Sequence, residues 1–228
     1  MSKNLDKDQI DGLLGWYSAE ADRAMFNIQL LERFFDSEID NGFFYSHLGR
    51  VTRHIIPSSG DALIMFIARC WDRTKSTDKL EKLKKAILCF GYEHGNKNET
   101  ENSIRKLTLL RFPEIDSAEA QKRAKEDFDA ITCAFEKWKL ASEIRIIRNG
   151  YIAHIDWSKI TSSQKVELLK LLNMAKDTIE IIQMLEKAWT GSERSGRPKI
   201  AKLASETFWI VMKDNQGASH LETDEEAN

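Results

Sequence analysis

Apolar residues recur at intervals of three and four along most of this chain, and this spacing restricts it to helices. The clearest stripe, between Asp8 and Phe35, consists of Leu13, Leu14, Tyr17, Ala21, Met25, Ile28, Leu31 and Phe35. Such spacing places the apolar side chains on one face of an α-helix, whereas a half-buried strand would alternate every second residue. Three prolines and 11 glycines in 228 residues are also too few for a turn-rich β-protein. We therefore predict an all-α fold, an up-and-down helical bundle with additional helices.

Residues that begin and end helices predict further boundaries. After a break at Asn41-Gly42, we expect a helix over 43–55 that stops at Pro57. Ser58 or Ser59 would then cap a separate helix, whose apolar residues are Leu63, Ile64, Phe66, Ile67 and Trp71. The remaining predicted helices cover 77–88 (capped by Thr77), 101–110, 116–147, 163–189 and 200–212.

Two of the predicted helices have a well-defined apolar face. The inner face of the 116–147 helix would consist of Phe128, Ile131, Phe135, Trp138, Ile144 and Ile147. The face of the 163–189 helix would consist of Leu168, Leu171, Leu172, Ala175, Ile179, Ile182 and Leu185. No alternating strand pattern and no internal repeat interrupts this helical series.

Composition along the chain predicts four parts. Residues 1–190 would form one helical domain, and 191–199, rich in Gly and Ser, a flexible linker. Residues 200–213 would form a C-terminal helix, and 214–228 a disordered acidic tail.

The net charge and the cysteines limit the classes of protein to which the chain can belong. A net charge of −2 argues against coating of nucleic acid by bulk electrostatics, but it allows RNA binding by a local patch. Cys70, Cys89 and Cys133 are odd in number and far apart, so they predict neither a disulfide framework nor a metal site. No apolar run reaches the ~18 residues of a membrane span, and the polar N-terminus does not resemble a signal peptide. We predict a cytoplasmic protein without a membrane segment.

One short motif combines the residue types needed to cut a phosphodiester, and its sequence is RNGYIAH, from Arg148 to His154. Arg148 keeps its positive charge, and its guanidinium can donate two hydrogen bonds to phosphate oxygens. His154 can gain or lose a proton near neutral pH. Asn149 could orient the reacting groups through its amide. These three are the candidate catalytic residues, with Arg145 and Tyr151 as candidate substrate-binding residues.

The spacing of the motif leaves its geometry open. Six residues of ideal helix would turn Arg148 and His154 about 120° apart. They would converge if the backbone were distorted at Gly150, or if a second copy of the chain supplied the missing group. A purely structural alternative is that Arg148 closes a helix C-terminus and that His154 and Asp156 cap the next segment. The residues alone do not decide between these readings.

The wording RNGYIAHID late in a long helical chain resembles the signature of the HEPN superfamily (higher eukaryotes and prokaryotes nucleotide-binding domains), and most closely its abortive-infection U-type branch. The apolar stretch from Ala62 to Leu83, with its Arg/Asp-bearing end and second short helix, resembles the same branch. The resemblance spans about residues 10 to 190. It implies a compact helical domain of the kind that acts as a metal-independent RNase in toxin–antitoxin and anti-phage systems.

Family resemblance also implies the chemistry. The ribose 2′-hydroxyl would attack the adjacent phosphodiester, with His154 as general base or acid and Arg148 stabilising the charge on phosphorus. No cofactor and no metal are expected. The expected partners are the RNA substrate, a second copy that completes a composite active site, and an antitoxin protein. The alternatives are a non-catalytic HEPN dimer that binds nucleic acid, nucleotide or a protein, and a helical bundle without a site.

A second candidate for RNA binding is the basic stretch Arg69–Lys85. It contains seven basic and three acidic residues, so its field could steer RNA toward the motif. The competing interpretation is an ordinary solvated helix face.

Overall fold

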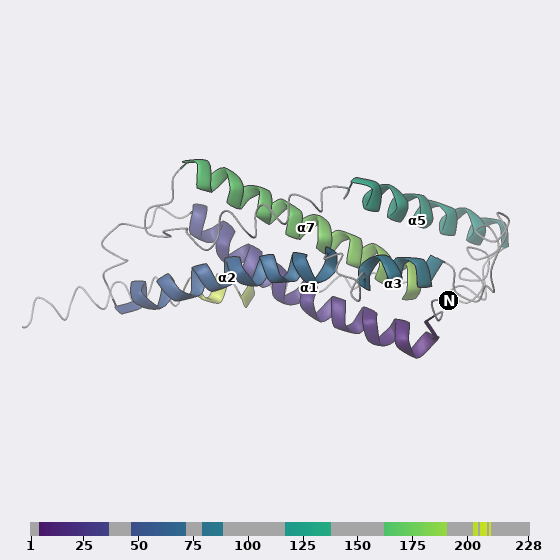
Figure 1. The fold of residues 1–228 in the computed structure, drawn as a ribbon, viewed down its shortest axis with the longest axis horizontal. Helices are drawn as coiled ribbons and strands as arrows, with labels where there is room; N and C mark the ends of the chain where they lie inside the picture. Colours follow the sequence, from purple (N-terminus) through teal and green to yellow (C-terminus); the bar gives the residue numbers. More distant parts are fainter. Residues whose placement is uncertain are drawn as a thin grey trace, which may run out of the picture. The chain divides into compact units, whose positions relative to one another are not determined.

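The computed structural model describes residues 5–36, 47–71, 79–88, 117–137 and 162–190, together with 203, 204, 206–208 and 210. All of these residues are helical except Leu5 and Asp6, and the part of the chain that is described contains no strand. The prediction of an all-α fold is therefore confirmed. Figure 1 labels the helices α1 (Lys7–Asp36), α2 (His47–Trp71), α3 (Lys79–Leu88), α5 (Ser117–Lys137) and α7 (Ser162–Thr190).

Helix α1 begins with a reciprocal cap. The backbone N–H of Gln9 donates to Asp6 Oδ1 at 2.8 Å, and the backbone N–H of Asp6 donates to Gln9 Oε1 at 3.1 Å. This arrangement satisfies backbone donors that have no partner inside the first turn. The buried apolar face then consists of Ile10, Leu14, Tyr17, Ala21, Ala24, Ile28, Leu30, Leu31 and Phe34. The predicted helix over Asp8–Phe35 is confirmed, although Leu13 and Met25 of the predicted stripe are only half-buried.

Helix α7 agrees most closely with its sequence pattern. The predicted helix over 163–189 is observed as Ser162–Thr190. All seven residues of its predicted apolar face are buried, from Leu168 at one end to Leu185 at the other. Long amphipathic helices are well predicted because one period holds over many turns.

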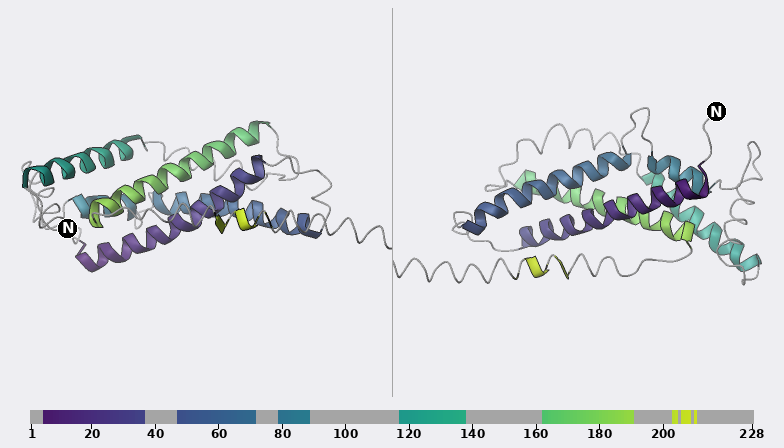
Figure 2. Two further views of the ribbon diagram at one scale, coloured as in Figure 1. Left: turned by 180° about the vertical axis from the view of Figure 1, so that it is seen from behind. Right: turned by 90° about the horizontal axis from the view of Figure 1, so that it is seen from below.

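The prediction that Pro57 stops a helix was wrong. Helix α2 runs without interruption from His47 to Trp71, as the views in Figure 2 also show. Pro57 lies in its interior. Proline removes one backbone donor and costs about 3 kcal/mol inside a helix. Burial of Ile56 before it and Leu63 after it offsets this cost, since each such side chain contributes about 1.5–3 kcal/mol. Ser58 and Ser59 do not cap a helix as expected, because both lie inside α2. Ser59 is buried, and the Ser58 hydroxyl donates to the His54 carbonyl at 2.7 Å.

Helices α3 and α5 follow their predictions in part. Helix α3 buries Leu80, Leu83 and Ile87. Helix α5 buries Ile131, and Phe135 is half-buried. The other predicted elements, or parts of them, lie outside the described residues; they are the Thr77 cap, the 101–110 helix, 138–147 of the long helix, the 191–199 linker and the 214–228 tail.

The described chain divides into two compact units. The first unit contains 5–21, 67–71, α3, α5 and 177–190. The second unit contains 22–36, 47–66, 162–176 and the helical residues between Leu203 and Ile210. In the second unit Lys176 Nζ lies 2.5 Å from Glu32 Oε1, and Arg33 Nη2 lies 3.9 Å from Glu206 Oε1.

Candidate functional site

The predicted catalytic residues Arg148, Asn149 and His154 lie outside the described residues, and so do Arg145 and Tyr151. Their roles therefore stay predictions. The structure does describe the two helices that flank the motif in the chain, because α5 ends at Lys137 and α7 begins at Ser162. The contacts of α5 and α7 in the first unit show how these flanking helices are held.

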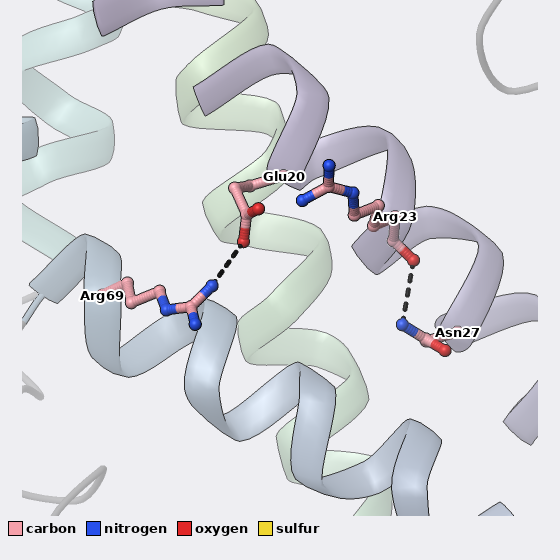
Figure 3. A network of polar contacts seen from close by, with 4 residues as sticks. All are labelled: Glu20, Arg23, Asn27 and Arg69. Atoms are coloured by element: carbon pink, nitrogen blue, oxygen red, sulfur yellow. Dashed lines mark hydrogen bonds and ion pairs between the residues drawn. The ribbon is translucent and has the colours of Figure 1, made fainter. Parts of the chain in front are cut away.

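An ion pair joins α1 to α2 in the first unit. Arg69 Nη1 donates to Glu20 Oε2 at 3.0 Å, and Figure 3 shows the two side chains pointing toward each other. The Glu20 side chain is 10% exposed and the Arg69 side chain 51% exposed, so the carboxylate is buried and the guanidinium still reaches solvent. The same figure marks the hydrogen bond that the Asn27 amide donates to the Arg23 carbonyl of α1. Its length is 3.0 Å.

The sequence contains a signal for this pair that hydrophobic periodicity alone does not reveal. Glu20 lies three residues after Tyr17 and directly before Ala21, which places a carboxylate within the apolar face of α1. A buried carboxylate requires a cation or hydrogen-bond donors. The identity of its partner depends on the tertiary fold, and only the structure assigns Arg69 to it.

Two weakly acidic groups interact electrostatically near this ion pair. Burial raises the pKa of the Tyr17 hydroxyl well above its ordinary value, and the neighbouring Cys70 raises it further. Burial likewise raises the pKa of the Cys70 thiol, with a further increase from Glu20 that Arg69 opposes. Both groups are therefore protonated at neutral pH, and Cys70 is a poor nucleophile. The Tyr17 hydroxyl makes no hydrogen bond within the described part of the chain.

An aromatic cluster joins α5 to three other helices of the first unit. The rings of Trp71 and Phe135 meet edge-on, with centroids 5.4 Å apart and planes at 62°. Lys84 Nζ lies 4.5 Å from the Phe135 centroid. Trp71 Nε1 donates to the buried Thr178 Oγ1 at 3.0 Å. Burial lowers the pKa of Lys84, although Glu81 and Glu136 oppose that shift.

A further hydrogen bond holds the end of α7. Trp189 Nε1 donates to Asp11 Oδ1 of α1 at 2.6 Å. Trp71 and Trp189 are both half-buried, and each donates its indole N–H to a polar partner. Trp16 is 37% exposed, and its ring meets Tyr17 edge-on.

The basic stretch Arg69–Lys85 is used partly within the protein. Arg69 pairs with Glu20, and Lys84 lies over Phe135. Lys82 and Lys85 are exposed on α3 and remain available for phosphate contacts or for water. Both interpretations of the stretch stay open.

Metal-ligand clusters and membrane-spanning helices are both absent from the residues that the structure describes. Among them there is no group of three or more His, Cys, Asp or Glu side chains placed to hold a metal ion. In the same ranges, none of the helices combines the length and the apolar character needed to span a bilayer.

Comparison with family models gives one informative match. The model described as AbiU2 (HEPN_AbiU2) matches residues 46–203 of the 228. This range covers more than half of the chain and includes both the motif and the Ala62–Leu83 stretch. Helix α1 precedes it. Comparison with curated proteins and with solved structures gives no match.

Proposed function

Since the chain belongs to the AbiU2 family of HEPN domains, we propose that it is a metal-independent endoribonuclease of abortive-infection or toxin–antitoxin type. The match to this family model confirms the resemblance that the sequence indicated. The observation that carries the proposal is that the matched range includes Arg148, Asn149 and His154. These residues supply a fixed cation, an amide and a titratable imidazole within one short segment.

The proposed reaction is an internal transesterification. The 2′-oxygen of one ribose attacks the adjacent phosphorus, and the bond from phosphorus to the 5′-oxygen of the next nucleotide breaks. His154 takes the proton from the 2′-hydroxyl or gives one to the leaving 5′-oxygen, a contribution of about 10²–10⁴ in rate. The products are a 2′,3′-cyclic phosphate and a free 5′-hydroxyl.

The cationic residues have a separate role in this proposal. Arg148 stabilises the negative charge that develops on the phosphoryl oxygens, because its planar fork matches them in geometry. Asn149 binds a phosphate oxygen or orients one of the other two groups. Arg145, three residues before Arg148, and Tyr151 contact the RNA beside the cleaved bond.

A second copy of the chain completes the active site in this proposal. Arg148 and His154 would diverge by about 120° on one ideal helix, so a single helix does not bring both onto one phosphate. Two copies about a two-fold axis would place both motifs in one groove. The cytoplasm is the proposed compartment, and an antitoxin protein is the proposed partner that restrains the enzyme.

The test is cleavage of labelled total RNA or tRNA in EDTA by the wild-type protein and the variants Arg148→Ala and His154→Ala. His54→Ala is the matched control, since His54 is an exposed histidine of α2 that belongs to no proposed site. We expect EDTA-resistant cutting with 2′,3′-cyclic phosphate ends, retained in the control and lost in both motif variants. Equal cutting by wild type and His154→Ala would exclude the proposed role of His154. Absence of cutting by wild type at high concentration would favour a non-catalytic HEPN dimer.

A further inference from the structure

One side of α1 points away from the core between Asp8 and Arg23. Exposed residues recur along this side, and they are Asp8, Gly12, Gly15, Trp16, Ala19 and Arg23. We name these six residues the outer α1 face. Because α1 is one continuous helix, they fall within an arc of about 100°. The buried residues Ile10, Tyr17 and Ala21 lie on the opposite side of the same helix.

Two charged residues of opposite sign mark the ends of the outer α1 face. Asp8 lies in the first turn of α1, and Arg23 lies about 22 Å further along the helix axis. Both side chains are exposed. A surface that is acidic at one end and basic at the other is complementary to a copy of itself in the reverse direction.

Trp16 supplies an apolar contact at the centre of the outer α1 face. Its side chain is 37% exposed, although tryptophan is a large hydrophobic residue. The ring meets Tyr17 edge-on, with centroids 4.9 Å apart, so it is held in place and still reaches solvent. Tryptophan in such a position is typical of protein interfaces.

Packing within the chain does not explain the two glycines beside Trp16. A Cβ added at Gly12 or at Gly15 would meet no atom within 4 Å. Glycine is unfavourable inside a helix, so alanine would suit the isolated chain better at both positions. Glycine does allow a second helix to approach the backbone closely, because the distance between packed helices depends on the side chains at the contact.

The arrangement of these residues identifies a second copy of this chain as the partner. When two α1 helices pack antiparallel about a two-fold axis between Gly15 and Trp16, each Asp8 lies opposite Arg23 of the second copy. Gly12 then lies opposite Ala19, and Trp16 lies next to its own counterpart. A parallel pair would place like charges together at both ends, and these would repel.

We propose that α1 pairs antiparallel with α1 of a second copy through the outer α1 face. Gly12, Gly15 and Ala19 allow the close approach, and Trp16 supplies the apolar contact. The two Asp8–Arg23 ion pairs determine the antiparallel direction. The interface does not depend on ribonuclease activity, and α1 lies before residue 46, where the family match begins.

The experiment measures the dimer dissociation constant of the full chain by sedimentation equilibrium. We expect Asp8→Arg and Arg23→Asp each to raise the Kd about 5- to 30-fold, because each turns two attractive contacts per dimer into repulsive ones. The double variant Asp8→Arg/Arg23→Asp should return to within about 3-fold of wild type, since both pairs are restored with reversed sign. Asp129→Arg is the matched control, because it alters an exposed aspartate of α5 and should leave the Kd unchanged.

Gly12→Gln tests the close approach separately from folding. Glutamine favours a helix more than glycine and has open space at this position, so thermal unfolding of the monomer should not shift to lower temperature. The added side chain would hold the two helices apart, and we expect the Kd to rise about 10-fold or more. A variant that folds better and associates less is not explained by loss of structure.

Three outcomes would overturn the interface. A wild-type chain that stays monomeric at about 100 µM would show that a second copy does not bind this face. A dimer whose Kd is unchanged by Gly12→Gln and by both single charge reversals would be joined through another surface. A double variant that associates no better than the single variants would exclude the antiparallel pairing of Asp8 with Arg23. None of these results bears on RNA cleavage, which the His154→Ala comparison tests.

Discussion

Glu20 places a carboxylate within the buried face of α1, where it forms an ion pair with Arg69. The Glu20 side chain is 10% exposed, so removal of its ion-pair partner leaves a charge that water reaches poorly. The Lys176–Glu32 pair of the second unit differs, because its side chains are 49% and 38% exposed. Burial therefore decides which of the two pairs matters for stability.

We expect Arg69→Met to lower the free energy of unfolding by about 1–3 kcal/mol, reduced from the fully buried case because the guanidinium is half-exposed. Lys176→Met should cost less than about 1 kcal/mol, since both partners of that pair are solvated. Urea denaturation of the two variants measures both values. Equal losses would show that the Glu20 carboxylate does not depend on Arg69.

Ionisation of Tyr17 makes the free energy of unfolding depend on pH in the alkaline range. Burial raises the pKa of Tyr17 above its ordinary value of 10.0 and that of Cys70 above 9.0. Well below pH 9 both groups are protonated in the folded and unfolded states, and stability does not depend on them. As pH rises further, the unfolded chain loses these protons first, so the free energy of unfolding decreases.

We expect Tyr17→Phe to change stability by less than about 0.5 kcal/mol at pH 7, because the hydroxyl has no hydrogen-bond partner in the described ranges. The variant should also lose less stability than wild type between pH 9 and pH 10.5. Denaturation midpoints at several pH values test this. Parallel curves for the two proteins would mean that Tyr17 ionisation does not contribute.

At the level of helices, hydrophobic periodicity predicted most of what the structure describes. It located α1 and α7 within a few residues, because the apolar face of each continues over many turns. It failed at Pro57, where a local signal for a helix end is overridden by burial on both sides. Contacts such as Trp71 with Thr178 were beyond prediction, since they join residues that only the tertiary fold brings together. The sequence located the motif at Arg148–His154, but its spacing does not determine how these side chains converge.

Pro57 should therefore be a point where α2 can be strengthened. Pro57→Ala restores a backbone donor for the carbonyl of Arg53 and removes the clash of the ring with that carbonyl. We expect the free energy of unfolding to rise by about 1–2 kcal/mol, less than the full helix penalty because proline also restricts the unfolded chain. Thermal and urea unfolding measure the change. Ser58→Ala, which removes the hydrogen bond to the His54 carbonyl, is the control and should not stabilise. A less stable Pro57→Ala variant would show that the proline is favourable at its position.

For the whole molecule, the proposed composite active site predicts complementation between inactive variants. Arg148→Ala and His154→Ala proteins, each inactive alone, should regain part of the wild-type cleavage when they are mixed and allowed to exchange subunits. Each mixed dimer contains one intact copy of each side chain and can form one complete site, and random exchange of equal amounts makes about half of all dimers mixed. A mixture that stays inactive, although mass spectrometry shows mixed dimers, would indicate that each active site uses residues of a single copy.

Helix α1 lies before residue 46, where the family match begins, yet it contributes to both units. Its buried face packs in the interior, and its side chains pair with Arg69, Trp189 and Lys176. The range that matches the family model therefore leaves out a helix that is packed against it. A chain trimmed to the matched range would lose these partners and expose the apolar surface that α1 covers.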